Sequence, residues 1–172
     1  MNAKKKLFYY LFAAVVSAIL IFIDQFTKLL VLNNLSGGHE IVIWEGVFKI
    51  VSHKNTGAVW GIMSDKTTFL AVITVVILAA VVWIFARIPL DETRFRPVRI
   101  ILIFVFSGAI GNFIDRVRLK YVVDFLYFEL IDFPVFNIAD CYITLSMILL
   151  IILFIFYYKD EDFDYLWHRK SN

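Results

Sequence analysis

Four apolar runs that are free of charged residues constrain this chain more than any other feature of its sequence. They cover residues 7–23, 67–86, 100–114 and 141–158. A helix needs roughly 20 apolar residues, with about 17 tolerated, to cross a bilayer core of about 30 Å, and each run reaches or approaches this length with its flanks. The sequence therefore predicts a mainly α-helical membrane protein. Its four transmembrane helices are expected over residues 7–32, 67–87, 99–115 and 140–158.

The composition supports this class and excludes others. Hydrophobic residues make up 61% of the chain and charged residues 19%, which is far from the balance of a soluble globular domain. The net charge of +2 is too small for bulk electrostatics to favour a nucleic-acid partner. The single cysteine, Cys141, excludes an intrachain disulfide.

The distribution of lysine and arginine predicts the orientation in the membrane. These residues are concentrated before the first run, between the second and third runs, and after the fourth. Cytoplasmic segments carry the excess of positive charge, so both termini are expected in the cytoplasm. Segments 33–66 and 116–139 then face outward.

Both outward segments contain patterns typical of ordered structure. Residues 40–52 are rich in Ile, Val, Trp and Phe around Glu45-Gly46, which predicts two short strands joined by a tight turn. Residues 121–136 are aromatic enough to form a loop in the membrane interface. No repeat or linker divides the chain, so we expect one integral membrane domain over residues 1–172, with a small extracytoplasmic β-sheet and an interfacial loop.

Three aspartates belong to the same end of the predicted bundle. Asp24 lies roughly 25 Å along the first helix and Asp115 roughly 24 Å along the third, while Asp140 begins the returning fourth helix. An ionisable side chain in a membrane span needs a reason, because it costs roughly 2.5 to 3.5 kcal/mol at mid-bilayer. Three aspartates at one depth, near the outer membrane surface, therefore indicate a shared function. The alternative is structural: Asp140 as a helix cap, and Asp24 with Lys28 as an i,i+4 ion pair.

An Asn-x-x-Asp spacing occurs at two of these helix ends. Asp115 follows Asn112 and Asp140 follows Asn137, while Arg116 shares a helix face with Asn112. Two carboxylates brought together cannot both ionise easily, so one keeps a proton and the other acts as a base. Such a pair can activate water against an amide carbonyl and then protonate the leaving nitrogen.

Motifs for other hydrolytic chemistries are missing from the sequence. His39-Glu40 has no second histidine at the zinc-protease spacing, and neither a Gly-x-Ser-x-Gly elbow nor a phosphate-binding glycine loop occurs. We therefore expect no metal and no cofactor, and interpret Cys141 as a packing residue.

Residues 55–61 combine an amide with two glycines, which suits close approach to a peptide; the alternative is an interfacial turn anchored by Trp60.

Assembled in order, these clusters resemble lipoprotein signal peptidase (signal peptidase II), a family of bacterial membrane aspartyl proteases that mature prolipoproteins. The resemblance covers nearly the whole chain, and five motifs in the right order are highly specific. They are Asp24-Gln25-x-Thr27-Lys28, Asn55-x-Gly57-Ala58, Gly108-x-x-Gly111-Asn112-x-x-Asp115-Arg116, Val122-Val123-Asp124-Phe125 and Phe136-Asn137-x-Ala139-Asp140.

The resemblance implies roles for these residues. Asp115 and Asp140 are expected to be the catalytic pair, which cuts before the cysteine that carries diacylglycerol. Asp24 and Lys28 are expected to support the site, and Asp124 to fix the outer loop. The residues expected to shape the pocket and hold the substrate are Asn55, Gly57, Asn112, Arg116, Asn137 and Ala139.

The resemblance also implies a location and partners. We expect a multi-pass protein of the bacterial cytoplasmic (inner) membrane, with its active site toward the extracytoplasmic face. Diacylglyceryl-prolipoproteins and membrane lipid are its expected partners, and we expect a monomer. The alternatives are a small proton-coupled transporter that uses the same acids, which predicts acids at several depths, and a non-catalytic scaffold, in which Asp115→Asn is harmless.

Overall fold

The computed structural model describes residues 2–57 and 67–162. Within these residues four helices are long and apolar enough to cross a membrane, which confirms the predicted class of a four-helix membrane protein: α1 (Ala3–Asn34), α2 (Thr67–Arg87), α3 (Arg96–Leu119) and α4 (Ile138–Phe156). The predictions for the end of the loop at 58–61 and for the tail beyond residue 162 lie outside the described residues.

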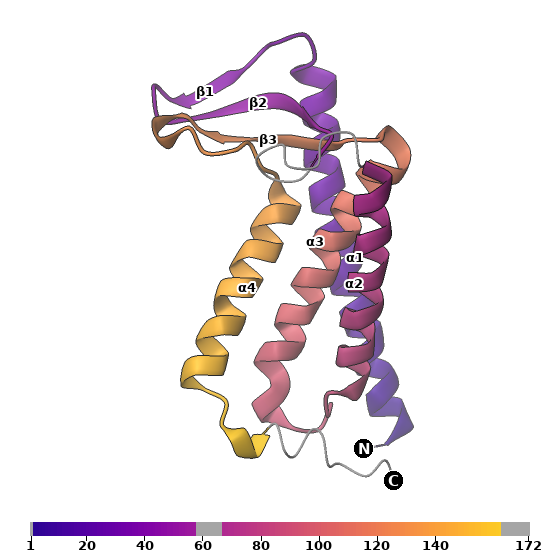
Figure 1. Cartoon of the computed structure of the whole chain (residues 1–172). Coiled ribbons are helices and arrows are strands. Elements are labelled where there is room, and N and C mark those ends of the chain that lie inside the picture. The colour runs from indigo at the N-terminus through magenta and orange to yellow at the C-terminus, as the bar shows by residue number, and fades with distance from the viewer. Residues whose placement is uncertain (1, 58–66, 163–172) are drawn as a thin grey trace.

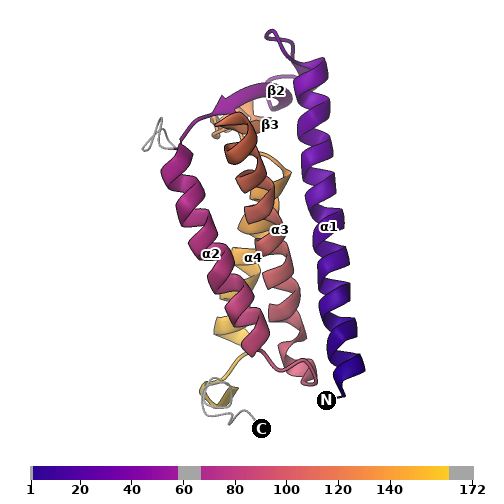
Figure 2. The same cartoon turned by 90° about the vertical axis from the view of Figure 1, so that its right-hand side faces the viewer.

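Helix α3 is the centre of the bundle and packs against each of the other three helices (Figure 2). Half of its apolar segment is buried in the protein, against 6 to 11% for the other three, so those helices turn most of their side chains toward lipid. Close packing of α3 on α4 depends on Gly108, where an added Cβ would lie 2.6 Å from the carbonyl oxygen of Ala139.

A three-stranded antiparallel sheet covers one end of the bundle (Figure 1). Its strand order is β1 (Ile41–Trp44), β2 (Phe48–Asn55) and β3 (Val122–Phe128). The expected pair of strands around Glu45-Gly46 is confirmed as β1 and β2, and Gly46 takes the positive φ of 67° that this turn requires.

Strand β3 replaces part of the loop that the aromatic sequence predicts over 121–136. It pairs with β2 along its length, from Phe128 opposite Phe48 to Val122 opposite Asn55. Its first four residues are all buried, and two of them, Val123 and Phe125, pack against Val31 and Leu35 of the α1 end. The short 3-10 turn η3 (Glu129–Ile131) follows the strand.

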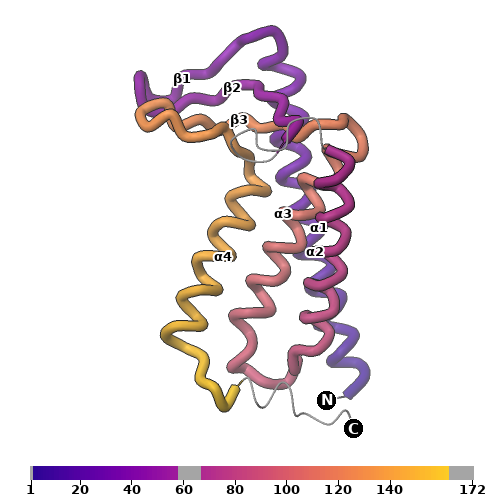
Figure 3. The backbone as a smooth tube through the Cα atoms, in the orientation of Figure 1, coloured from indigo at the N-terminus to yellow at the C-terminus, as the bar shows by residue number. Residues whose placement is uncertain are grey.

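The course of the backbone places both ends of the described chain on the side away from the sheet. Figure 3 follows α1 toward the sheet, α2 away from it, α3 back and α4 away again. The segments that connect α1 with α2, and α3 with α4, therefore meet at the sheet end. This agrees with the predicted even number of spans, and it brings residues far apart in the sequence to one site.

Candidate active site

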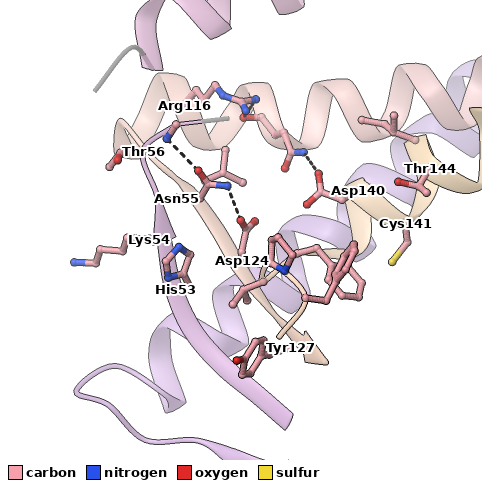
Figure 4. A pocket seen from close by; sticks show the side chains of 18 of the residues that line it. His53, Lys54, Asn55, Thr56, Arg116, Asp124, Tyr127, Asp140, Cys141 and Thr144 are labelled. Atoms are coloured by element: carbon pink, nitrogen blue, oxygen red, sulfur yellow. Dashed lines mark hydrogen bonds between the residues drawn. The ribbon is translucent and has the colours of Figure 1, made fainter. Parts of the chain in front are cut away.

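Polar side chains from three helices and two strands meet where the bundle joins the sheet. A cavity of about 1090 Å³ opens there, with residues of β2, β3, α3 and α4 on its walls (Figure 4). Among the residues predicted from the sequence, those that line it are Asn55, Gly57, Asn112, Arg116, Asp124 and Asp140.

Asp140 is held at the beginning of α4 by a capping box. The side chain of Asn137 accepts from the backbone N–H of Asp140 at 3.0 Å, and Asp140 Oδ2 accepts from the backbone N–H of Asn137 at 3.1 Å. Its other oxygen, Oδ1, accepts from the Asn112 amino group at 2.8 Å. The predicted cap is therefore present, and the same carboxylate also lines the cavity.

Asp124 is a charged side chain within the buried part of β3, and it faces the same cavity. It is 1% exposed. Its oxygens accept from the amino groups of Asn137 at 2.6 Å and Asn55 at 2.8 Å. Burial, together with the nearby charge of Asp140, raises the pKa of Asp124 to about 7. At neutral pH this group is thus partly protonated.

Two asparagines connect the carboxylates. Asn137 donates to Asp124 and also donates, at 3.1 Å, to Oδ1 of Asn112, whose amino group donates to Asp140. Asn137 is fully buried at the start of α4, while Asn112 comes from α3. These bonds fix Asp124 and Asp140 in one network on the wall of one cavity.

Asp115, predicted from the sequence as one of the catalytic pair, does not line the cavity. It is 3% exposed, and it faces α1. Its Oδ2 lies 2.9 Å from Nζ of Lys28 and accepts from the backbone N–H of Val123, and its Oδ1 accepts from Gln25. Both oxygens are occupied by contacts that tie α1, α3 and β3 together.

Asp24 and Lys28 form the predicted i,i+4 ion pair, at 3.0 Å, but they are buried rather than interfacial. Asp24 also accepts, at 3.0 Å, from the backbone N–H of Ala139 in the first turn of α4. Ala139 is fully buried behind the cavity wall and is not part of its lining. Asp24 thus helps to cap α4 from another helix.

Sequence reasoning missed two contributions to this site. The sequence gives Gln25 no role beyond its place in a motif, yet its amino group donates to Asp24, Asp115 and the carbonyl of Gly111. Asp124 was assigned to loop support. The signal that could have identified it is a single carboxylate in an otherwise apolar run, Val122–Phe128, because a buried charge needs a reason.

One side of the cavity is apolar. Ile143 and Leu145 of α4 line it together with Phe133 and Phe136, which precede that helix. Leu145 and Phe133 are also exposed on the outside of the protein. The cavity therefore combines three carboxylates, of Asp124, Asp132 and Asp140, and the guanidinium of Arg116 with a wall that suits an apolar ligand.

The chain matches proteins and structures of one kind. The family model described as signal peptidase (SPase) II matches residues 16–156. A lipoprotein signal peptidase of Brevibacillus brevis is 41% identical over 146 residues, which cover 85% of this chain and 93% of the relative. One from Staphylococcus aureus strain MRSA252 is 39% identical over 147 residues, with 84% and 88% covered.

Two solved structures have the same fold. Both are bacterial membrane enzymes determined by the in meso method, at 2.3 and 1.9 Å resolution. The first is 33% identical with a TM-score of 0.75 and covers 93% of this chain and 92% of its own. The second is 35% identical with a TM-score of 0.72, and the match covers 85% of this chain and 94% of the second structure's chain.

Proposed function

Since the chain belongs to the signal peptidase II family, we propose that Asp124 and Asp140 are its catalytic pair. The activity of the family, removal of the signal peptide from prolipoproteins, is the activity of this chain, and the chain is a multi-pass bacterial membrane protein. These relatives give no support to the transporter alternative. The aspartic mechanism and the residues that perform it are our proposal.

One observation carries this choice of residues. Asp124 and Asp140 line the same cavity and are both hydrogen-bonded to Asn137, whereas Asp115 lies outside the cavity with its oxygens occupied by Lys28, Gln25 and the backbone. A catalytic carboxylate needs access to the reacting atoms. We therefore propose Asp124 in the role that the sequence assigned to Asp115.

The environments of the two carboxylates support different roles. The beginning of α4 and the donors Asn112 and Asn137 partly offset the cost of desolvating the charged form of Asp140, which supports its role as the general base. The raised pKa of Asp124, about 7, suits a general acid. Asp124 then holds the proton in the resting pair.

The reaction follows from these assignments. Asp140 removes a proton from a water molecule while the oxygen of that water bonds to the scissile carbonyl carbon. At the same time Asp124 gives its proton to the carbonyl oxygen. When the carbon–nitrogen bond of the resulting diol breaks, the proton on Asp140 passes to the leaving nitrogen. One hydroxyl proton of the diol returns to Asp124. The products are a carboxylic acid and an amine, and both aspartates regain their starting states.

The apolar wall supports a substrate that carries lipid. A diacylglyceryl-cysteine keeps its acyl chains in the bilayer, so its peptide bond lies near the headgroups. The cavity lies at the sheet end of four membrane-length helices, next to exposed apolar residues such as Leu145 and Phe133. We propose that this end faces the extracytoplasmic side of the cytoplasmic membrane, and that a monomer performs the reaction.

The test compares three Asp→Asn variants of the purified full-length protein, in detergent or lipid. The substrate is a diacylglyceryl-modified prolipoprotein, with the unlipidated precursor as a control for dependence on lipid. Asp124→Asn and Asp140→Asn are expected to lower the rate by at least about a thousandfold. Asp132→Asn is the matched control, because Asp132 lines the same cavity but bonds to Tyr127. Wild-type cleavage by a folded Asp124→Asn protein would refute the assignment.

A further inference from the structure

Lys28 is a buried cation close to the proposed catalytic pair, although it is on a helix that is otherwise mostly exposed to lipid. It is 2% exposed, and the buried residues of α1 lie on one face of the helix. Its ammonium has three acceptors, with Asp24 at 3.0 Å, Asp115 at 2.9 Å and Asn112 Oδ1 at 2.9 Å. An ammonium has three hydrogens, so this set satisfies all of them.

The bond to Asn112 goes beyond charge neutralisation. Two carboxylates already compensate the charge of Lys28, so its third bond has a different consequence. A carboxamide has an acceptor end and a donor end, and its neighbours decide which way each end points. The acceptor end of Asn112 receives Lys28 and Asn137, and the donor end faces Asp140.

The reverse orientation of Asn112 is unfavourable on both sides. Its amino group would then meet the ammonium of Lys28 and the amino group of Asn137, and its oxygen would meet the carboxylate of Asp140. The contacts with Lys28 and Asp140 are the strong ones, because hydrogen bonds to ionised groups are roughly twice as strong as the neutral one to Asn137. Lys28 therefore selects the observed orientation from the acceptor end of Asn112, as Asp140 does from the donor end.

We propose that Lys28 is a positioning residue for catalysis, because its ammonium fixes the Asn112 carboxamide so that the amino group of Asn112 holds Asp140. The inference rests on the proposed role of Asp140 as a catalytic residue. Lys28 does not line the cavity, and its contact with Asp140 runs only through Asn112. It differs in this from Arg116, which is on the cavity wall itself.

The first test is a double-mutant cycle with Lys28→Met, Asn112→Ala and the combined variant. Methionine has a similar length to lysine and cannot donate, so Lys28→Met is expected to lower kcat by about ten- to a hundredfold, with KM changed less than about threefold. In the Asn112→Ala background, Lys28→Met is expected to have no further effect on kcat. Losses that multiply in the combined variant would overturn the proposal.

The pH profile is the second readout, because it reports the charge of Lys28 at the proposed pair, whereas kcat reports the position of Asp140. The groups around Asp124 that carry or can carry charge are Asp140, Lys28, Arg116 and, opposite it on β2, His53. Lys28 lowers the pKa of Asp124, so its removal is expected to move the loss of activity at high pH upward. An unchanged profile in an active Lys28→Met protein would contradict the proposal.

Controls keep the outcomes distinct. Lys49→Met removes a lysine that pairs with Glu40 and Glu129 away from the cavity, and it is expected to leave kcat and the profile unchanged. If Lys28→Met does not fold, the charge-balanced Lys28→Met/Asp115→Asn variant takes its place. Failure of both to fold assigns Lys28 to folding and overturns the inference.

The failure of this inference can be told from failure of the proposed function. If Asp124→Asn and Asp140→Asn are inactive while a folded Lys28→Met protein has wild-type kcat, only the positioning role is refuted. If either aspartate variant still cleaves, the proposed catalytic pair is refuted whatever Lys28→Met does.

Discussion

Replacing Asp124 by asparagine should abolish cleavage and at the same time stabilise the folded protein at pH 8. The carboxyl group is 1% exposed, and it accepts from Asn55 and Asn137. Its ionisation in this place is unfavourable, because burial and the charge of Asp140 raise its pKa to about 7. Asparagine has nearly the shape of the protonated acid and never ionises, but its amino group cannot accept a hydrogen bond as the oxygen it replaces does. The variant therefore removes the pH-dependent penalty together with the proposed catalytic proton, and it loses one hydrogen bond at every pH.

The size of the effect follows from the difference in the pKa of Asp124 between the folded and the unfolded protein. This pKa is about 7 in the folded protein, and in the unfolded chain it has the ordinary value of 3.8. The folded protein binds the proton more tightly, so its stability falls as the pH rises from about 4 and levels off above about 7. At 1.36 kcal/mol per pKa unit, the penalty is roughly 2 kcal/mol at pH 5 and roughly 4 kcal/mol at pH 8. The increase of this penalty between pH 5 and pH 8 corresponds to a change in Tm on the order of 5 to 10 °C.

The assay is thermal unfolding of wild type and Asp124→Asn at pH 5, 6, 7 and 8 in one detergent, followed by tryptophan fluorescence. The difference in Tm between variant and wild type is expected to grow with pH and to be positive at pH 8. Asp132→Asn, which changes a carboxylate at the rim of the same cavity, is the control and should show no such growth. A difference that is constant or shrinks toward pH 8 would refute the reasoning.

Three further changes have expected outcomes. Asp115→Asn weakens one contact of Lys28 and should lower stability by about 2 kcal/mol, yet leave measurable cleavage; a folded but inactive variant contradicts this. Gly111→Ala places a Cβ against a buried carboxylate oxygen of α1 and should cost about 1 to 3 kcal/mol, measured by denaturation. Asn137→Asp keeps the cap of α4 but adds an acid beside the proposed pair, so Tm should fall more steeply with rising pH than in wild type.

The membrane architecture could be predicted from local features of the sequence. Each span is a continuous apolar run, and the β1–β2 turn has a glycine where the backbone requires positive φ. Strand β3 could not be predicted in the same way, because its partner β2 is about 70 residues earlier and its apolar run Val122–Phe128 has no alternation. The sheet depends on tertiary pairing rather than on local pattern.

The aspartates of the site show where depth alone is insufficient. Helix rise predicts that Asp115 reaches the sheet end, and it does, but rise says nothing of the direction in which a side chain points. Asn112 and Arg116 are four residues apart and both line the cavity. Asp115 directly precedes Arg116, so its side chain is rotated by about 100° from that of Arg116, and it faces α1. Asp124 is on a strand, to which a helix-depth argument does not apply.

The four carboxylates of this hydrogen-bonded network, those of Asp24, Asp115, Asp124 and Asp140, differ in how their charge is compensated. Asp24 and Asp115 both pair with Lys28. Within the described parts of the chain, Asp124 and Asp140 have amide and backbone donors but no lysine, arginine or histidine nitrogen within 4.0 Å. Two carboxylates on one cavity wall without a direct cation reduce their mutual repulsion by retaining a proton. Under the proposed function, the position of one lysine thus separates the structural pair from the pair that keeps the proton for peptide hydrolysis.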